Sequence, residues 1–249
     1  MSDKENSERT FWEFDDKDIS KKISYADFEK AHKNEESINR KLDSYIEALQ
    51  NKGFDFANIK AIDIGSGRGD WLKKLEIYTD SALGIDIDKE MVEMCEASGL
   101  KVIEEDFLKY AKKIESQSVD LVSAFQIIEH MTTDDLLMLI HEVSRILKPG
   151  GFIVLETPNT QNMLTGLYNF HADPTHKRPI HIVWLDFVLV QMGFHEIEQL
   201  FIDEDAYKEL KQTDERIVKS ILHSDIKKLL RQVNTFANAQ TNLSIIAKR

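Results

Sequence analysis

The sequence predicts an α/β protein in which an open, mostly parallel sheet is covered by helices on both faces. Two observations predict this fold class. Short apolar segments of the kind that form buried strands alternate with segments of helical periodicity. A glycine-rich turn, "GSGRG" at 65–69, joins the first such strand to the next helix. Ligands of such sheets bind beyond the carboxyl ends of the strands, so the strand ends are the first places to look for a site.

The first 56 residues precede this alternation. Residues 1–23 are largely charged, and we expect them to form a flexible N-terminal arm. Residues 24–56 contain an amphipathic helix whose apolar positions recur at helical spacing until Gly53, a plausible stop signal. We expect this helix to pack on the core of a single domain that comprises residues 57–249.

Within that domain, the apolar segments that we expect to be strands are, in chain order, 60–65, 82–86, 101–106, 118–125, 151–159, 196–202 and 242–249. Helices are expected after the glycine turn (70–78), after the second strand (89–98) and after the fourth (133–147). Two more are expected at 182–192 and, as an insertion before the last strand, at 205–236. The apolar stripe of the 205–236 helix is typical of a core contact, and a lid or a homodimer surface remains the alternative.

Composition excludes several classes of function. The net charge of −12 argues against a nucleic-acid partner, because binding phosphates requires a basic surface. Cys95 is the only cysteine, which excludes an internal disulfide and a thiolate zinc cluster and favours a reducing, cytoplasmic compartment. No apolar run approaches the roughly 20 residues of a membrane span, and the charged N-terminus lacks the apolar region of a signal peptide.

The glycine turn is the first candidate binding element. Its spacing is G-x-G-x-G, formed by Gly65, Gly67 and Gly69. A dinucleotide fingerprint would need glycine where Asp70 stands, which tells against a nicotinamide-dependent oxidoreductase, and no lysine follows as in a phosphate-binding loop. Together with Asp63, Asp70 places negative charge on both sides of the turn and favours a ligand that carries an ammonium group.

Two further acids lie at the ends of the next strands. Asp86 follows the turn by about twenty residues, where a carboxylate can accept both hydroxyls of a ribose. Asp106 ends the third strand, where it can accept a hydrogen bond from an exocyclic amine, and Phe107 stands next to it for contact with an aromatic ring. An adenosine joined to an amino acid fits these features, and this describes S-adenosylmethionine (SAM).

The motifs "DIGSGRGDWL" and "LKPGGFIVLETPN", with Asp86 between them, resemble those of the class I SAM-dependent methyltransferases over residues 57–249. The resemblance implies a Rossmann-like, seven-stranded, mostly parallel sheet whose last strand is antiparallel, and SAM as the cofactor. It also implies that the residues after the fourth strand lie near the sulfonium, among them His130. The cofactor-binding residues expected in this way are Asp63, Gly65, Gly67, Gly69, Asp86, Ile87, Asp106, Phe107, Phe125 and Gln126.

A narrower resemblance extends into the following loops. The segments "EHM", "LKPGGFIVLETPNTQN" and "FHADPTHKRPIH" look like those of methyltransferase domains in enzymes that cap bacterial surface polysaccharides (O-antigens). Ser66 and Asp70 depart from the usual cysteine and glutamate, and the kinase module of some members is missing, which tells against a second, phosphorylating role. The resemblance implies O-methylation of a glycan, at a sugar hydroxyl or a terminal phosphate. It is also compatible with binding partners among polysaccharide-assembly enzymes, which would hold the chain at the inner membrane.

Residues 170–181 have the chemistry of an acceptor loop. Asp173 and His176 form a candidate oriented base, and His130 and His181 are further catalytic candidates. The candidate acceptor-binding residues are Asn159, Tyr168, Lys177 and Arg178, which offer an amide, an aromatic face and two cations.

Each of these residues also has a plainer interpretation. Asp173 can simply initiate a turn before Pro174, Lys177 and Arg178 can be solvated loop charges, and His130 can have a structural role. A metal site formed by His171, His176 and His181 with Asp173 has a spacing that is not a standard ligand pattern, so we expect no metal. Methylation of another small polar metabolite, and a non-catalytic SAM-binding scaffold, are the alternative functions.

Overall fold

The computed structural model describes residues 35–200 and 242–249. The arm expected at 1–23, the start of the N-terminal helix at 24–34 and the helical insertion expected at 205–236 lie outside these residues.

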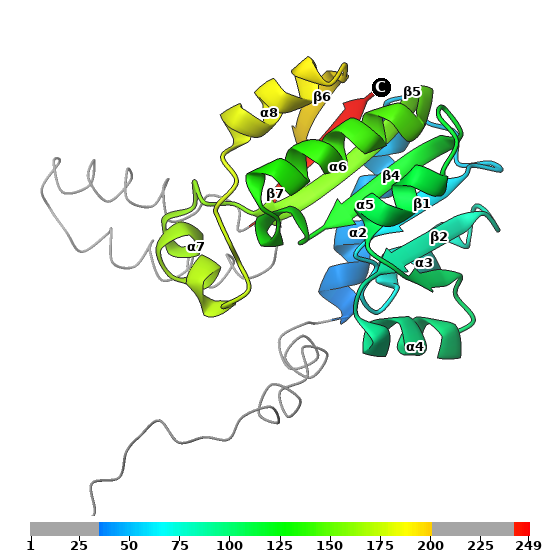
Figure 1. Cartoon of the computed structure of the whole chain (residues 1–249), viewed down its shortest axis with the longest axis horizontal. Coiled ribbons are helices and arrows are strands. Elements are labelled where there is room, and N and C mark those ends of the chain that lie inside the picture. The colour runs from blue at the N-terminus through cyan, green and yellow to red at the C-terminus, as the bar shows by residue number, and fades with distance from the viewer. Residues whose placement is uncertain (1–34, 201–241) are drawn as a thin grey trace, which may run out of the picture. The chain divides into compact units, whose positions relative to one another are not determined.

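The described residues form one seven-stranded sheet with helices on both faces (Figure 1). The strands are β1 (Ala61–Ile64), β2 (Ala82–Asp86), β3 (Val102–Glu104), β4 (Val119–Phe125), β5 (Leu147–Pro158), β6 (His195–Leu200) and β7 (Asn242–Lys248). Their order is β3-β2-β1-β4-β5-β7-β6. Strands β1 to β5 pair in parallel, whereas β7 is antiparallel to both β5 and β6. The predicted fold class, with its antiparallel last strand, is confirmed.

The strand order reverses at β1, which pairs with β2 on one side and with β4 on the other. At such a switch point the connections leave the sheet in opposite directions, and a crevice opens beyond the carboxyl ends of the strands. The residues that follow β1, β2 and β4 therefore face a common space.

Four of the described α-helices begin at a capping side chain. The α-helices are α2 (Glu35–Asn51), α3 (Asp70–Leu75), α4 (Lys89–Ala97), α5 (Phe107–Tyr110), α6 (Thr133–Ile146), α7 (Met163–Leu167) and α8 (Ile182–Gln191). Short 3-10 helices are η1 (Ala111–Lys113), η2 (Ile128–His130) and η3 (Asn169–Ala172). Side chains of Asp88, Asp106, Thr132 and His181 accept backbone N–H groups at the starts of α4, α5, α6 and α8.

Two apolar clusters cover the two faces of the sheet. One combines strand residues with Leu136 and Ile140 of α6 and Leu185 of α8. The other combines strand residues with Tyr45 of α2 and Trp71 of α3. All five of these side chains are at most 2% exposed, so α2 is an integral part of the core of this unit.

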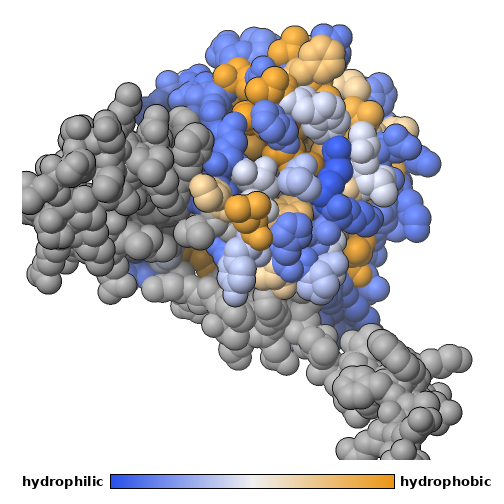
Figure 2. Space-filling view, turned by 90° about the vertical axis from the view of Figure 1, so that its left-hand side faces the viewer, coloured by the Kyte–Doolittle hydropathy of each residue, from blue (hydrophilic) through white to orange (hydrophobic). Residues whose placement is uncertain are grey.

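The sequence placed some boundaries differently. We expected β3 to run to Asp106, but it ends at Glu104, and β5 begins at Leu147 rather than at 151. In α8, Val183, Phe187 and Val190 are more than half exposed. Figure 2, which views the left-hand side of Figure 1, shows hydrophobic residues among hydrophilic ones on that face.

Among the described residues, no helix has both the length and the apolarity needed to cross a membrane.

Candidate functional site

The turn between β1 and α3 requires glycine at all three positions. Gly65, Gly67 and Gly69 have φ angles of 66°, 50° and 76°, a backbone region that other residues rarely adopt. A Cβ on Gly65 would lie 2.0 Å from Cδ1 of Ile127. A Cβ on Gly67, in contrast, would meet nothing within 4 Å, so the middle of the turn borders open space.

Asp86 joins this turn to the end of β2. Its Oδ2 accepts the N–H of Gly67 at 2.8 Å and its Oδ1 accepts the N–H of Asp88 at 2.9 Å. The carboxylate is largely buried, and burial raises its pKa. The backbone N–H of Ile87 also interacts with this carboxylate. A carboxylate can accept about four hydrogen bonds, which leaves it capacity for a ligand hydroxyl. The next residue, Ile87, is 76% exposed and places an apolar side chain beside the carboxylate.

Asp63 is buried in β1, next to the turn. The hydroxyl of Ser123 donates a hydrogen bond of 2.6 Å to its Oδ1. Burial, together with the nearby charges of Asp86 and Asp70, raises the pKa of Asp63 to about 7. Asp70 itself forms a 3.2 Å ion pair with Arg68. Three acidic side chains, those of Asp63, Asp70 and Asp86, thus lie next to the turn.

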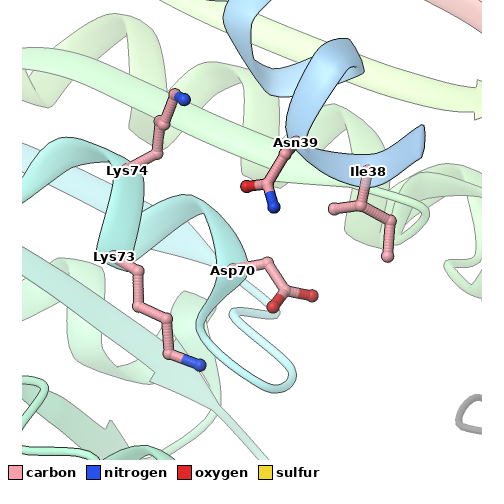
Figure 3. Close-up of a pocket in the computed structure, with 5 residues that line it drawn as sticks. All are labelled: Ile38, Asn39, Asp70, Lys73 and Lys74. Atoms are coloured by element: carbon pink, nitrogen blue, oxygen red, sulfur yellow. The ribbon is translucent and has the colours of Figure 1, made fainter. Parts of the chain in front are cut away.

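A pocket of about 230 Å³ lies beside this turn, between α2 and α3 (Figure 3). Its lining residues are Ile38, Asn39, Asp70, Lys73 and Lys74. Asn39 from α2 and Asp70 from α3 lie on opposite sides of it. Apart from Asp70, none of these residues was singled out from the sequence, because the pocket is formed by two helices that are distant along the chain.

A buried polar network centred on Glu156 of β5 lies at the carboxyl ends of β4 and β5. Its carboxylate accepts hydrogen bonds from the Lys41 ammonium at 2.8 Å, from the Tyr45 hydroxyl and from the Gln126 amide at 2.9 Å. Burial by itself raises the pKa of Glu156, but Lys41 and these hydrogen bonds outweigh burial and hold it below its usual range. The network ties α2 to the carboxyl ends of β4 and β5.

Gln126 and Phe125 occupy the predicted position at the end of β4. Gln126 has a φ of 57°, and its amide also reaches Asn242 of β7 at 3.1 Å. The ring of Phe125 packs against those of Tyr45 and Trp71, with centroid distances of 5.0 and 5.5 Å. Both side chains are therefore held in place by contacts within the protein.

Beyond β4, a cluster brings together Glu129, His130 and His176, with one potential metal-ligating atom from each lying within 4.8 Å of the others. The Glu129 carboxylate is fully buried. Its Oε2 accepts the Thr157 hydroxyl at 2.9 Å, whereas its Oε1 has no hydrogen-bond partner among the described residues. Burial raises the pKa of Glu129 to about 8. His176 Nε2 lies 4.0 Å from that Oε1 and 3.8 Å from Oδ2 of Asp173.

Hydrogen bonds fix the tautomers of both imidazoles. His176 Nδ1 lies 2.7 Å from the carbonyl oxygen of Phe170, which can only accept, so Nδ1 carries the proton. His130 Nδ1 lies 2.9 Å from the Thr175 hydroxyl, whose own proton goes to Asp173 at 2.5 Å, so this Nδ1 is also a donor. Burial lowers the pKa of His130. In its neutral form each ring therefore offers a lone pair on Nε2.

Of the remaining predicted residues, Asp173 lies beside this cluster, whereas His181 and Asp106 cap helices. Asp173 accepts the N–H of Thr175 at 2.8 Å, the turn role that was the plainer interpretation, and it also faces His176. His181 is exposed and caps α8 by accepting the N–H of Val183 at 3.3 Å. Asp106 caps α5 through the N–H of Lys109, and Phe107 is only 6% exposed.

The candidate acceptor residues differ in accessibility. Tyr168 is 76% exposed, and Lys177 is exposed as well. Asn159 is buried, and its Oδ1 accepts the N–H of Gln161. The Arg178 guanidinium stacks on the Trp184 ring at 4.6 Å.

Comparison with known proteins shows which class of protein the chain resembles. Residues 62–155 match the family model described as a methyltransferase domain. A probable SAM-dependent methyltransferase of Mycolicibacterium smegmatis is 26% identical over 167 residues, which cover 67% of this chain and 63% of that relative. A SAM-dependent methyltransferase structure from Archaeoglobus fulgidus superposes with a TM-score of 0.73 at 25% identity, covering 91% of this chain and all of that one.

The chain has the fold of the class I SAM-dependent methyltransferases, and its residues 62–155 match a methyltransferase domain. A methyltransferase structure from Mesorhizobium loti shares the fold, with a TM-score of 0.57 at 17% identity over 82% of this chain and 96% of that one. A Haemonchus contortus phosphoethanolamine N-methyltransferase in complex with S-adenosylhomocysteine shares the fold too. Its TM-score is 0.59 at 16% identity, covering 83% of this chain and 52% of that one. This chain spans less than two thirds of the length of the curated mycobacterial relative.

The methyltransferase domain fits SAM at the glycine turn. Open space borders Gly67, where a side chain would intrude on a bound cofactor. Asp86 keeps lone pairs at the end of β2, and Ile87 presents apolar surface for a flat ring. These features suit a ribose with its base, with the amino-acid end of SAM directed toward the carboxyl group of Asp63.

Sequence reasoning missed two buried carboxylates near the candidate site, Glu129 and Glu156. Each stands next to an apolar segment, in "AFQIIEHM" and "GFIVLETP", where a lone acid is unusual enough to serve as a signal. Nothing in the local sequence indicated their partners, because Thr157, Lys41 and His176 come from other elements.

Proposed function

We propose that this methyltransferase transfers the methyl group of SAM to an oxygen of a glycan, either a sugar hydroxyl or a terminal phosphate, in bacterial surface-polysaccharide synthesis. The observation that carries the proposal is the cluster of Glu129, His130 and His176 beyond β4, with Asp173 beside it. We call these four residues the acceptor centre. They belong to the two segments, "EHM" and "FHADPTHKRPIH", whose motifs resemble those of polysaccharide-capping enzymes.

SAM supplies the methyl group in activated form, on a positively charged sulfur. The chain's own residues must hold the donor and place the acceptor oxygen in line with it. Asp86 would accept the ribose hydroxyls, the backbone at Gly67 would approach the cofactor, and Ile87 would cover one side of the adenine.

A hydroxyl acceptor must also lose its proton as the new C–O bond forms. The Nε2 lone pairs of His176 and His130 are the available proton acceptors in the acceptor centre, and Asp173 stabilises positive charge that develops there. The proton would pass from the hydroxyl to Nε2, while the methyl group leaves sulfur and S-adenosylhomocysteine departs. A phosphate acceptor is already an anion and needs no base.

Arg178 supports an anionic group on the acceptor. Its Nε and Nη2 are buried and have no hydrogen-bond acceptor among the residues that the structure describes. A guanidinium presents paired donors that match phosphate or carboxylate oxygens. Arg178, with the exposed Lys177 next to it, would thus hold an acidic sugar or a phosphate close to the acceptor centre.

The test is a methyl-transfer assay that measures S-adenosylhomocysteine release with bacterial glycan preparations before and after phosphatase treatment. The chain should turn over with glycan, and His176→Ala should lower kcat by about 100-fold or more if a hydroxyl is methylated. His171→Ala is the matched control, because His171 is an exposed histidine of the same loop that is not part of the acceptor centre. Turnover with simple amines but with no glycan would overturn the proposal.

A further inference from the structure

Two imidazoles and a carboxylate converge in the acceptor centre in a way that a proton-transfer role does not fully explain. Glu129 and His130 come from η2 at the end of β4, whereas His176 comes from the loop before α8. The rings of the two histidines meet edge to face, with centroids 4.8 Å apart. Neutral imidazole nitrogens and carboxylate oxygens are the ligand set that zinc and its first-row neighbours prefer.

The carboxylate of Glu129 is buried, and one of its two oxygens faces His176. Glu129 is 0% exposed, and its Oε1, which lies 4.0 Å from His176 Nε2, has no hydrogen-bond donor among the described residues. A buried polar atom of this kind is costly unless it binds something. Its Oε2 is already held by Thr157, which fixes the direction of the free oxygen.

The second layer of contacts is the one expected around metal ligands. Histidines that bind a metal through Nε2 donate their Nδ1–H to a carbonyl or to another fixed acceptor. His176 donates to the Phe170 carbonyl at 2.7 Å, and His130 donates to Thr175, which is itself anchored on Asp173. Both Nε2 atoms are therefore left as oriented lone pairs.

We propose that Glu129, His130 and His176 form a binding site for one divalent cation of the zinc class. In a tetrahedral zinc site with bonds of about 2.1 Å, ligand atoms lie about 3.4 Å apart. The separations of up to 4.8 Å thus need the ligand atoms to move closer by at most about 1.4 Å. Three protein ligands leave a fourth position open, as in catalytic rather than structural sites.

The open position would take an acceptor oxygen. A cation there would lower the pKa of a bound hydroxyl, whose proton would pass to solvent water before methyl transfer, so the imidazoles would act as ligands and not as the base. Only this role of the ion rests on the proposed function, whereas binding of the ion does not. The site also differs from the one considered from spacing alone, since neither His171 nor His181 belongs to it.

The proposal is tested by titrating the chelator-treated, tag-free full chain with Co²⁺ and recording visible absorption, followed by competition with Zn²⁺. One equivalent should bind and produce the intense bands of a low-coordinate site. Glu129→Gln and His176→Ala should each weaken binding by about 100-fold or more, and Thr175→Val by about 10-fold through the lost support of His130. His195→Ala, a histidine that is exposed and lies on β6, should leave binding unchanged.

Binding of S-adenosylhomocysteine to each variant shows that it is folded, and His130→Gln provides a second ligand variant should one misfold. Absence of Co²⁺ binding by a chain that still binds S-adenosylhomocysteine would overturn the metal site and leave the proposed function standing. Equal binding by wild type and by the ligand variants would overturn it too. Metal binding without methyl transfer to any glycan would instead count against the proposed function alone.

Discussion

The backbone N–H of Gly67 donates a hydrogen bond of 2.8 Å to Oδ2 of Asp86, which connects the glycine turn after β1 to the carboxyl end of β2. This contact places the carboxylate at the mouth of the crevice and uses only part of its capacity to accept hydrogen bonds. The same residue can therefore shape the turn and hold the ribose of the cofactor.

The first prediction concerns the two glycines at the start of the turn. Gly65→Ala should destabilise the fold by several kcal/mol, because its Cβ would overlap Ile127 in addition to adopting a positive φ. Gly67→Ala should cost only about 1–2 kcal/mol for its φ angle, since its Cβ meets open space. Urea unfolding of both variants measures the difference, and equal losses would contradict this account. Gly67→Ala should still weaken SAM binding, because we expect the cofactor to bind in that open space.

A second prediction follows from the raised pKa of Asp63. The folded chain keeps this carboxyl protonated up to pH about 7, whereas the unfolded chain loses the proton near 3.8. Its contribution to stability is therefore complete below pH 3.8 and is lost as pH rises toward about 7. The free energy of unfolding of wild type, compared with that of Asp63→Asn, should fall across this range by up to a few kcal/mol. Parallel pH curves for the two proteins would show that Asp63 does not titrate in this way.

The third prediction concerns the ion pair between Glu156 and Lys41. Glu156→Ala leaves the ammonium of Lys41 without this partner and opens a gap between α2 and β5, so stability should fall by about 3–5 kcal/mol. Glu142→Ala is a suitable control, because Glu142 pairs with Arg145 within one helix near the surface. The free energy of unfolding of Glu142→Ala should fall by about 1 kcal/mol or less. Thermal unfolding of the three proteins checks the contrast, and similar melting temperatures would refute a central role for the network.

The sequence predicted more of the fold than of the candidate site. Strand–helix alternation and the glycine turn are local signals, so the sheet, its antiparallel last strand and the place of Asp86 followed from them and from the family resemblance. The acceptor centre depends on contacts between distant segments. Regular spacing grouped His176 with His171 and His181, but the fold joins it to His130 and Glu129 instead. The burial of Glu129 and Glu156 likewise depends on strand neighbours that no local pattern reveals.

Asp106 illustrates the same limit on a smaller scale. Its position after an apolar run predicted a strand end facing the adenine, and it does lie just beyond β3. The strand stops two residues earlier, and the side chain caps α5. A carboxylate at such a point can serve a helix or a ligand, and the sequence alone does not distinguish the two uses.

The central claim is that Asp86 holds the ribose of SAM at the end of β2, and calorimetry with S-adenosylhomocysteine tests it most directly. Wild type should bind one equivalent, and Asp86→Ala should weaken binding by about 10–100-fold for the loss of hydrogen bonds to a charged acceptor. Glu93→Gln, which removes an exposed acid on the adjacent helix, should bind like wild type. Undiminished binding by Asp86→Ala, or no binding by wild type, would contradict the account.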